Sequence, residues 1–240
     1  MSPRLSFLFS IGLLCCLLTG GCNQEPADIN KLMAAVGTGN VDDVRRELDK
    51  GFDKDRLNAL DGKDVPLTPL HLAAMDGHTQ VVALLLDRGV KPDLRLGYKQ
   101  AEGATPLIMA AGSGHTDTVV LLLSRGADPN ATMNDPPGLL NHGTSALDLA
   151  CQSGHLDMAN ALLNAGANIN GGGGITPLQM AASAGQVESV KFLISRGARV
   201  TIMDPGFARQ QGHPEIAAIL LKSLDPVSAV AAKRLMGNSH

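Results

Sequence analysis

The 240-residue sequence predicts an all-α repeat protein built from about six helix-turn-helix units. Two observations support this fold class. A glycine recurs at the same point of every unit, and in all but the last unit a second glycine follows it at a spacing of twelve residues. Helix-start residues and apolar residues of helical periodicity hold fixed positions around these glycines, as expected for a structural repeat. The first glycines of the units are Gly39, Gly77, Gly114, Gly154, Gly185 and Gly212.

The composition excludes several classes of function. The chain is 44% hydrophobic, 18% charged and only 2% aromatic, and its formal net charge is −3. This hydrophobic content is too high for a disordered chain. The lack of a basic cluster argues against a nucleic-acid partner, and the scarcity of aromatic residues argues against a surface for base stacking. We therefore expect a folded protein that does not bind nucleic acid.

Residues 1–21 predict a signal peptide. Arg4 precedes an uncharged, largely apolar run over residues 5–18. A helix of this length is too short to span a bilayer, but it matches the core of a signal peptide. Small residues then lead to Cys22, where we expect cleavage to leave the cysteine at the new N-terminus.

The segment Leu18-Thr19-Gly20-Gly21-Cys22 resembles the lipobox of bacterial lipoproteins. The resemblance implies diacylglycerol on the Cys22 thiol and acylation of the new amino group, with palmitate as the expected chain. Several acyl chains anchor a protein stably, because each buried methylene contributes about 0.8 kcal/mol. Residues 22–28 would form the lipidated cysteine and a tether, and Asn23 favours an outer-membrane location facing the periplasm. An ordinary signal peptide followed by an incidental cysteine is the alternative.

Each unit is expected to begin with a short inner helix. In the units that start at Thr68, Thr105 and Thr176, the threonine precedes a proline. A threonine hydroxyl caps a helix N-terminus, and proline is well suited to the first helical position. The unit at Ser145 keeps the hydroxyl but has Ala146 instead of proline. Leucine and small residues, mostly alanines, follow, and the first glycine ends the helix.

A second, outer helix follows the first glycine of each unit. Apolar residues lie four, five, seven, eight and nine positions beyond that glycine, which predicts a helix buried along a broad stripe. The second glycine is expected to end this helix in the left-handed conformation. Successive first glycines are 27 to 40 residues apart, so the unit is constant in length whereas the connections vary.

The unit at Thr68 reads TPLHLAA, then GH and VV-x-LLL, and the next unit adds GAD-x-N. This pattern resembles the ankyrin repeat, and the resemblance covers residues 29–224. It implies a solenoid of stacked helix pairs, with β-hairpin-like turns along one edge and a concave surface that binds proteins. The units at Leu32 and Met203 depart most from the pattern.

The two ends of the solenoid need surfaces that tolerate water. In the first unit, Arg46 and Glu47 occupy positions that are apolar elsewhere, which suits an exposed end. The last unit remains apolar at these positions. We therefore predict that residues 225–240 form a capping tail with a helix over 227–236. The side chains expected to cover the last unit are Val227, Val230, Ala231 and Leu235.

Candidate catalytic and metal-binding residues are better explained by folding. Histidines follow four of the first glycines, but equivalent positions on stacked helices are about 8–10 Å apart. Zinc requires nitrogen ligands within about 2.1 Å of one ion, so we expect these imidazoles to bind backbone in the turns. Cys151 replaces an alanine of the inner helix and is expected to be buried and unreactive. No nucleophile, phosphate-binding or zinc-protease motif is present, so we expect neither an enzyme nor a cofactor.

Residues that the repeat does not require are the candidates for binding a protein partner. Two sets meet this condition, the residues just before the first glycines and those in the long connections 94–102 and 131–142. The inner helices offer Met75, Asp76, Ser113, Gln152 and Ser153. The connections offer Arg95, Tyr98, Leu139 and Leu140. Long loops on rigid scaffolds are often functional, although simple insertions are also tolerated.

We therefore expect a membrane-anchored, monomeric, non-enzymatic ankyrin-repeat protein that binds another protein in the bacterial cell envelope. A preformed surface loses little conformational entropy on binding. Resemblance to ankyrin-like envelope proteins implies two more specific roles: an immunity protein that neutralises a periplasmic toxin, or a helper of an envelope stress-defence enzyme such as a catalase. An enzyme with its site in the divergent ends and a purely structural envelope protein are the competing interpretations.

Overall fold

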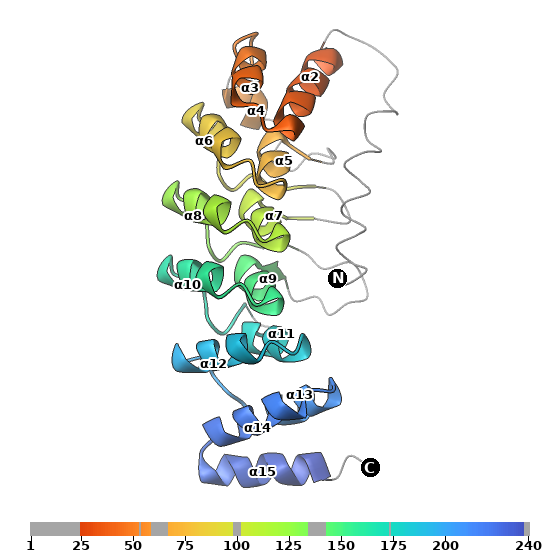
Figure 1. Ribbon diagram of the computed structural model, residues 1–240, viewed down its shortest axis with the longest axis vertical. Coiled ribbons are helices and arrows are strands. Elements are labelled where there is room, and N and C mark those ends of the chain that lie inside the picture. The colour runs from red at the N-terminus through yellow and green to blue at the C-terminus, as the bar shows by residue number, and fades with distance from the viewer. Residues whose placement is uncertain are drawn as a thin grey trace.

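The computed structural model describes residues 25–52, 54–58, 67–97, 102–133, 143–172 and 174–237. These residues form six helix pairs arranged as two parallel columns (Figure 1). The inner column consists of α2 (Glu25–Thr38), α5 (Pro69–Met75), α7 (Pro106–Ser113), α9 (Ala146–Ser153), α11 (Pro177–Ser183) and α13 (Asp204–Gln210). The outer column consists of α3 (Val41–Leu48), α6 (Thr79–Asp87), α8 (Thr116–Ser124), α10 (Leu156–Asn164), α12 (Val187–Ser195) and α14 (Pro214–Ser223).

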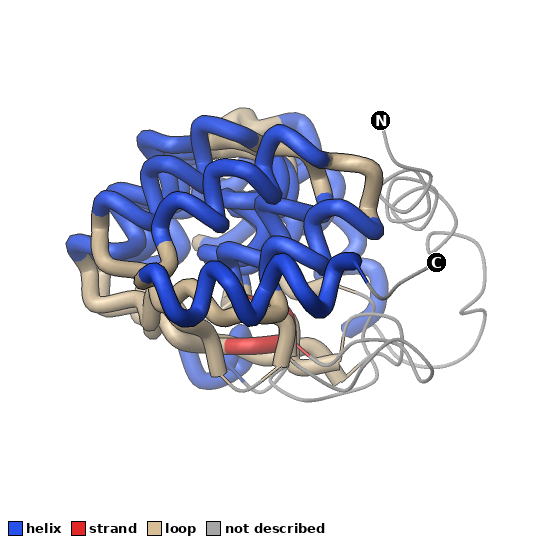
Figure 2. The backbone as a smooth tube through the Cα atoms, turned by 90° about the horizontal axis from the view of Figure 1, so that it is seen from below, coloured by secondary structure: helices blue, strands red, loops and turns tan. Residues whose placement is uncertain are grey.

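The architecture confirms the predicted all-α solenoid. Each inner helix packs against its own outer helix and against the inner helices of the neighbouring units. Strand structure in the described residues is limited to β1 (Thr132–Met133) and β2 (Thr144–Ser145), which pair in antiparallel register. This pair lies at one edge, below the helices in Figure 2, where the resemblance implied β-hairpin-like turns. A short helix, α4 (Lys54–Asn58), lies between the first two units.

The inner helices begin at the predicted caps. The Thr68, Thr105 and Thr176 hydroxyls each accept a hydrogen bond from the backbone N–H three residues further on. Ser145 caps α9 in the same way, and the Asp148 carboxylate accepts from the Ser145 backbone N–H in return. These side chains satisfy amide groups that the first turn of a helix leaves without partners.

The first glycines allow neighbouring units to approach closely. Gly39 and Gly77 both adopt a left-handed φ, at +70° and +73°. A β-carbon on Gly39 would lie 2.5 Å from Nδ1 of His78, which belongs to the next unit. The Nε2 atom of His78 donates to the carbonyl oxygen of Gly37 at 3.2 Å. This imidazole therefore binds backbone as predicted, but the carbonyl belongs to the last turn of α2 in the preceding unit and not to the turn between helices.

The remaining histidines after first glycines stand in equivalent places. His213 Nε2 donates to the carbonyl oxygen of Ser183 at 3.3 Å, as expected. The rings of His115 and His155 lie against the first glycines of their preceding units. Gln186 replaces histidine in the fifth unit, and its side chain occupies the same place against Gly154. Each unit therefore inserts one side chain over the turn of the unit before it.

A continuous apolar core lies between the two columns. It extends from Leu32 and Val44 in the first unit to Ile216 and Leu220 in the last. Asparagines add polar links along the turn edge. The Asn130 side chain, for example, donates to the carbonyl of Gly166 at 3.0 Å and accepts from the backbone of Asn168 at 2.8 Å. The units are thus joined by apolar packing in the interior and by hydrogen bonds at the edge.

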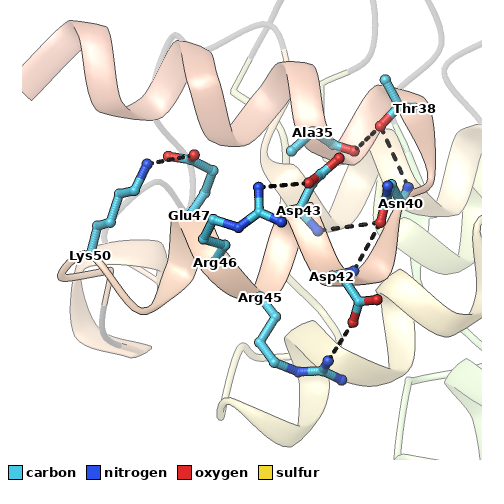
Figure 3. Close-up of polar contacts among 9 residues, drawn as sticks. All are labelled: Ala35, Thr38, Asn40, Asp42, Asp43, Arg45, Arg46, Glu47 and Lys50. Atoms are coloured by element: carbon cyan, nitrogen blue, oxygen red, sulfur yellow. Dashed lines mark hydrogen bonds and ion pairs between the residues drawn. The ribbon is translucent and has the colours of Figure 1, made fainter.

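The N-terminal end of the stack is polar, as its sequence indicates. Asn40 caps α3 by accepting from the backbone N–H groups of Asp42 and Asp43 (Figure 3). The Arg46 side chain, which is exposed, pairs with Asp43 at 2.9 Å. The start of α2 differs from the expectation, because the helix begins at Glu25 and therefore includes part of the predicted tether over 22–28. Pro26 explains this early start, since proline is favoured in the first turn of a helix.

At the other end, α15 (Pro226–Gly237) confirms the predicted closing helix but not its orientation. Of the four side chains expected to cover the last unit, Val227, Val230 and Leu235 are 81%, 51% and 46% exposed, and Ala231 is partly buried. Ala232 is instead fully buried, and Met236 contacts Gly206 of α13. Small residues on both helices allow a close approach, so the helix packs through its small residues and leaves the valines outside.

Candidate protein-binding surface

Each inner helix has one face that points away from the outer column. In α5, Leu70, Ala73 and Ala74 are fully buried in the core. Leu72 and Met75 are only partly buried. Residues three and four positions apart share one face of a helix, so Leu72, Met75 and Asp76 lie together on the other side of α5. The equivalent residues of the other units continue this face along the stack.

These equivalent residues form three rows, which we call the inner-helix strip. The first row contains Ala34, Leu72, Met109, Leu149, Met180 and Phe207. The second row contains Gly37, Met75, Gly112, Gln152, Ser183 and Gln210. The third row contains Thr38, Asp76, Ser113, Ser153, Ala184 and Gln211. The first row is entirely apolar, and Asp76 is the strip's single charged residue.

Two leucines of the first row pack closely against second-row glycines of the preceding unit. A β-carbon on Gly37 would lie 3.8 Å from Leu72 Cδ2, and one on Gly112 would lie 3.5 Å from Leu149 Cδ1. Each leucine therefore rests on the glycine of the preceding unit. Met109 is almost completely covered, at 8% exposed, whereas Leu72, Leu149 and Met180 remain half-buried. The first row is thus a line of apolar side chains that are partly accessible except at Met109.

A second apolar cluster connects the strip to the turn edge. Leu96, Ala104 and Met109 are buried together, and Met75 and Met133 pack against them. The Leu96 backbone N–H donates to the Ala104 carbonyl at 3.0 Å, which closes the base of the connection between α6 and α7. Two neighbouring connections, the one between α6 and α7 and the one between α8 and α9, are therefore fixed relative to the inner helices at their bases.

His71 fixes the same region from the core side. The ring is fully buried, and its Nε2 atom donates to the Ala104 carbonyl oxygen at 3.0 Å. Nδ1 therefore accepts from the Thr68 hydroxyl, which lies 2.8 Å away. This arrangement confirms a structural role for His71, because both of its ring nitrogens are occupied within the fold.

Asp76 lies in an electrostatic environment unlike that of the other acidic residues. It ends α5, and its partial burial raises the pKa of its carboxyl group, while the charges of His78 and His115 oppose this shift. Most other charged residues lie on the outer helices and turns, where several form ion pairs. Arg88, for example, pairs with Asp49 of the preceding unit at 2.8 Å. Among the residues that the structure describes, Asp76 forms no ion pair and accepts no hydrogen bond.

A shallow groove lies at the N-terminal end, between α2 and α3. Its volume is about 310 Å³. Three of its four charged side chains already have partners nearby: Asp43 pairs with Arg46, and Glu47 pairs with Lys50 at 2.7 Å (Figure 3). The groove is lined by Lys31, Ala34, Ala35, Thr38, Asp43, Arg46 and Glu47. Because most of its charges are paired and it is open to solvent, the groove has little to offer a small ligand.

Chemical groups suited to catalysis do not converge in the described part of the chain. No cluster of three or more histidine, cysteine, aspartate or glutamate side chains could hold a metal ion there. Burial, together with the nearby Asp148 carboxylate, raises the pKa of the Cys151 thiol to about 12. Thiolate formation at neutral pH is therefore strongly suppressed, which agrees with the structural role predicted for Cys151. No described helix has the length and hydropathy needed to cross a bilayer.

The structure brings five of the predicted binding residues together. Met75, Asp76, Ser113, Gln152 and Ser153 all lie in the second and third rows of the strip. Whether they contact a partner stays a prediction. The first row was not predicted, because an apolar residue in the middle of a short helix resembles core. Its signal was present in the spacing: each first-row residue lies five positions before the first glycine, three before the second row.

Of the other predicted binding residues, the structure describes Arg95 alone. Arg95 lies at the turn edge, where its side chain donates to the Thr132 carbonyl oxygen at 3.3 Å and so links two connections. Cys22 and the remaining candidates lie outside the described residues; these candidates are Tyr98, Leu139 and Leu140.

Comparison with known protein families agrees with the geometry. The family model for ankyrin repeats, which contains three copies of the repeat, matches residues 32–133 and again residues 133–204. The two matches are consecutive and together span well over half of the chain. The matched residues include five of the six first-row residues, and Phe207 lies beyond the second match.

Proposed function

The chain belongs to the ankyrin-repeat family, and on this premise we propose that it is a non-enzymatic scaffold whose protein partner docks along the inner-helix strip. Ankyrin repeats bind other proteins, and proteins built from them are generally binding scaffolds and not enzymes. The observation that carries the proposal is the composition of the strip. Its three rows contain apolar, small and neutral polar residues, interrupted by one charge at Asp76.

Physical chemistry favours such a surface for binding. Removing uncharged side chains from water carries a smaller penalty than removing charged ones, and each Å² of apolar area contributes about 25 cal/mol when it is buried. The strip is also preformed, because its side chains rest on glycines and on the second apolar cluster. A rigid surface loses little conformational entropy when a partner docks.

The docking proposal can be tested with two matched double variants. Ser113→Glu with Ser153→Glu places two charges on the strip. Ser124→Glu with Ser195→Glu places two charges at exposed ends of the outer helices. We expect affinity capture from native membranes to recover a partner with the wild type and with the outer-helix variant, but not with the strip variant. Equal recovery by the two variants would show that the partner binds elsewhere.

We further propose that the protein is a lipoprotein of a bacterial cell envelope, anchored through Cys22 and facing the periplasm from the outer membrane. The support is the sequence over residues 1–22: an uncharged run of signal-peptide length, small residues, and a cysteine at the expected cleavage point. Because α2 begins at Glu25, only two residues separate Cys22 from the first helix. The N-terminal unit would therefore lie close to the bilayer surface.

Cell fractionation tests the anchor. Cys22→Ala should release the protein from the membrane fraction, because the acyl chains that hold it there require the thiol. Cys151→Ala is the matched control and should remain in the membrane fraction, since its thiol is buried inside α9. A Cys22→Ala protein that stays with the membrane would refute the lipoprotein assignment without affecting the docking proposal.

A further inference from the structure

We propose that the partner segment bound on the inner-helix strip is apolar and carries one basic side chain, lysine or arginine, that pairs with Asp76. This inference rests on the docking proposal and specifies the chemistry of the partner. It follows from three properties of the strip: its apolar first row, its lack of cationic residues, and the position of its single carboxylate.

The distribution of charge supports the first part of the inference. The first row is apolar from Ala34 to Phe207, and the second and third rows have no lysine or arginine. A strongly acidic partner would find no counter-charge on this surface and would lose hydration without compensation. An apolar segment, by contrast, gains from covering half-buried Leu72, Leu149 and Met180.

The position of Asp76 supports the second part. It lies in the third row between Thr38 and Ser113, and its neighbour in the second row is Met75. Its own backbone N–H ends α5 by donating to the Leu72 carbonyl. The C-terminus of a helix carries a partial negative charge, so the carboxylate and the helix end both attract a cation at this point.

Asp76 has no ion pair of its own within the described residues, and the charges that reach its carboxyl group are those of the His78 and His115 imidazoles. The acidic residues Asp49, Asp87 and Glu188 each pair with a nearby arginine or lysine, but no described lysine or arginine pairs with Asp76. Partial burial raises the pKa of its carboxyl group, so the ionised form is less stable here than in water. A basic side chain from the partner would supply the missing counter-charge, in a setting less screened by solvent than the outer helices.

The flexible side chains around Asp76 allow the apolar part of a partner to vary. Met75, the neighbour of Asp76 in the strip, is partly exposed and packs against the second apolar cluster, which contains Met109. Methionine is unbranched and polarisable, so it can adapt to apolar groups of different shape. We therefore expect selection by charge at Asp76 and tolerance among apolar residues on either side.

A library of short random peptides, displayed on phage and selected on the immobilised full chain, provides the test. We expect the wild type to enrich apolar peptides with a lysine or arginine and to deplete acidic ones. Asp76→Asn should remove the enrichment of basic residues, and Asp76→Lys should replace it with enrichment of acidic residues. Asp117→Asn is the matched control, because Asp117 is exposed on outer helix α8, and it should select the same peptides as the wild type.

A selected peptide then allows a quantitative check. Replacing its basic residue by methionine should weaken binding to the wild type about fivefold, which corresponds to about 1 kcal/mol for a partly exposed ion pair. The same replacement should leave binding to Asp76→Asn unchanged, because the interaction is already lost.

The possible failures are distinguishable. If Asp76→Asn selects the same basic peptides, or if the wild type selects none, the inference about partner chemistry is wrong. If peptides bind equally well to the variant with Ser113→Glu and Ser153→Glu, they do not occupy the strip, and the docking proposal fails as well.

Discussion

At the scale of single residues, the interface between Gly77 and His115 shows why a glycine is needed at the end of each inner helix. Gly77 has a φ of +73°, and a β-carbon on it would lie 2.5 Å from the His115 ring. Two constraints therefore act on one position: the left-handed backbone and the close approach of the next unit. The second glycines are subject only to the first constraint in several units, as Gly126 shows, with a φ of +84° and no atom within 4 Å of a β-carbon.

This difference predicts unequal effects of the same substitution. Gly126→Ala should lower the free energy of unfolding by about 1–2 kcal/mol, the cost of a left-handed alanine. Gly77→Ala should lower it by at least about 1 kcal/mol more, because the His115 ring must move. Urea denaturation followed by circular dichroism measures both. In a His115→Ala background, the additional loss at Gly77 should disappear; if it persists, the ring is not its cause.

Asp76 is predicted to reduce stability in the absence of a partner. Burial raises the pKa of its carboxyl group above the ordinary value, so folding favours the protonated form. The stabilisation is present at low pH and is lost as the pH rises through the folded pKa. The α5 C-terminus adds a second unfavourable interaction with the carboxylate. Near neutral pH, Asp76→Asn should therefore be more stable than the wild type by about 0.5 kcal/mol.

Thermal unfolding at several pH values tests whether Asp76→Asn is more stable than the wild type. The advantage of Asp76→Asn should shrink as the pH is lowered toward about 4, where the carboxyl group is increasingly protonated. The charged groups that reach Asp76 are the imidazoles of His78 and His115, which favour the wild-type carboxylate. A wild type that is more stable than Asp76→Asn at neutral pH would contradict this account.

At the scale of elements, α15 shows the limit of hydrophobic periodicity. Val227, Val230 and Leu235 are spaced as one face of a helix, and the sequence predicts that they face the protein. The structure buries Ala232 instead, because α15 meets α13 where Gly206 allows close approach. The orientation of a helix depends on the shape of the surface beneath it, which its own sequence does not contain.

Two aspartate substitutions test this orientation. Ala232→Asp should lower the free energy of unfolding by about 2 kcal/mol or more, because it buries a charge without a partner. Val230→Asp should change it by less than about 0.5 kcal/mol, since Val230 is 51% exposed. Melting temperatures of the two variants are sufficient for the comparison. The reverse order would support the orientation expected from the sequence.

At the scale of the whole molecule, the stack is held together by contacts between neighbours. The main helix contacts lie within a unit or between adjacent units, and the core continues without a break from α2 to α14. Proteins of this kind have a stability that is approximately a sum over repeats and their interfaces. A substitution that destabilises one unit should therefore leave distant units folded.

Hydrogen exchange measured by mass spectrometry can show this locality. Leu220 is fully buried in α14, so Leu220→Asp should speed amide exchange in α13, α14 and α15. Exchange in α5 and α7 should stay close to the wild-type rates. Ala218→Asp, at an exposed position of the same helix, should leave amide exchange unchanged in both groups of helices. Uniform acceleration along the whole chain by Leu220→Asp would show that the molecule unfolds as one unit.

The sequence by itself determined the repeat, its helices and its turns, because these depend on residues close together in the chain. A threonine hydroxyl caps the helix that it precedes, and a glycine permits the turn in which it stands. Spacing also located five of the strip residues, including Asp76. The first row was not among the predicted binding residues, because a leucine in a short helix gives no sign of which face it occupies.

The tertiary structure decided what depends on neighbouring units. Stacking leaves Leu72 and Leu149 half-buried on glycines of the preceding unit and sets Asp76 apart as the one charge of the inner-helix strip. It also turns the valines of α15 away from the core. Exposure and electrostatic isolation are properties of the assembled stack, since they are determined by side chains that lie about one repeat away in the sequence but in direct contact in space.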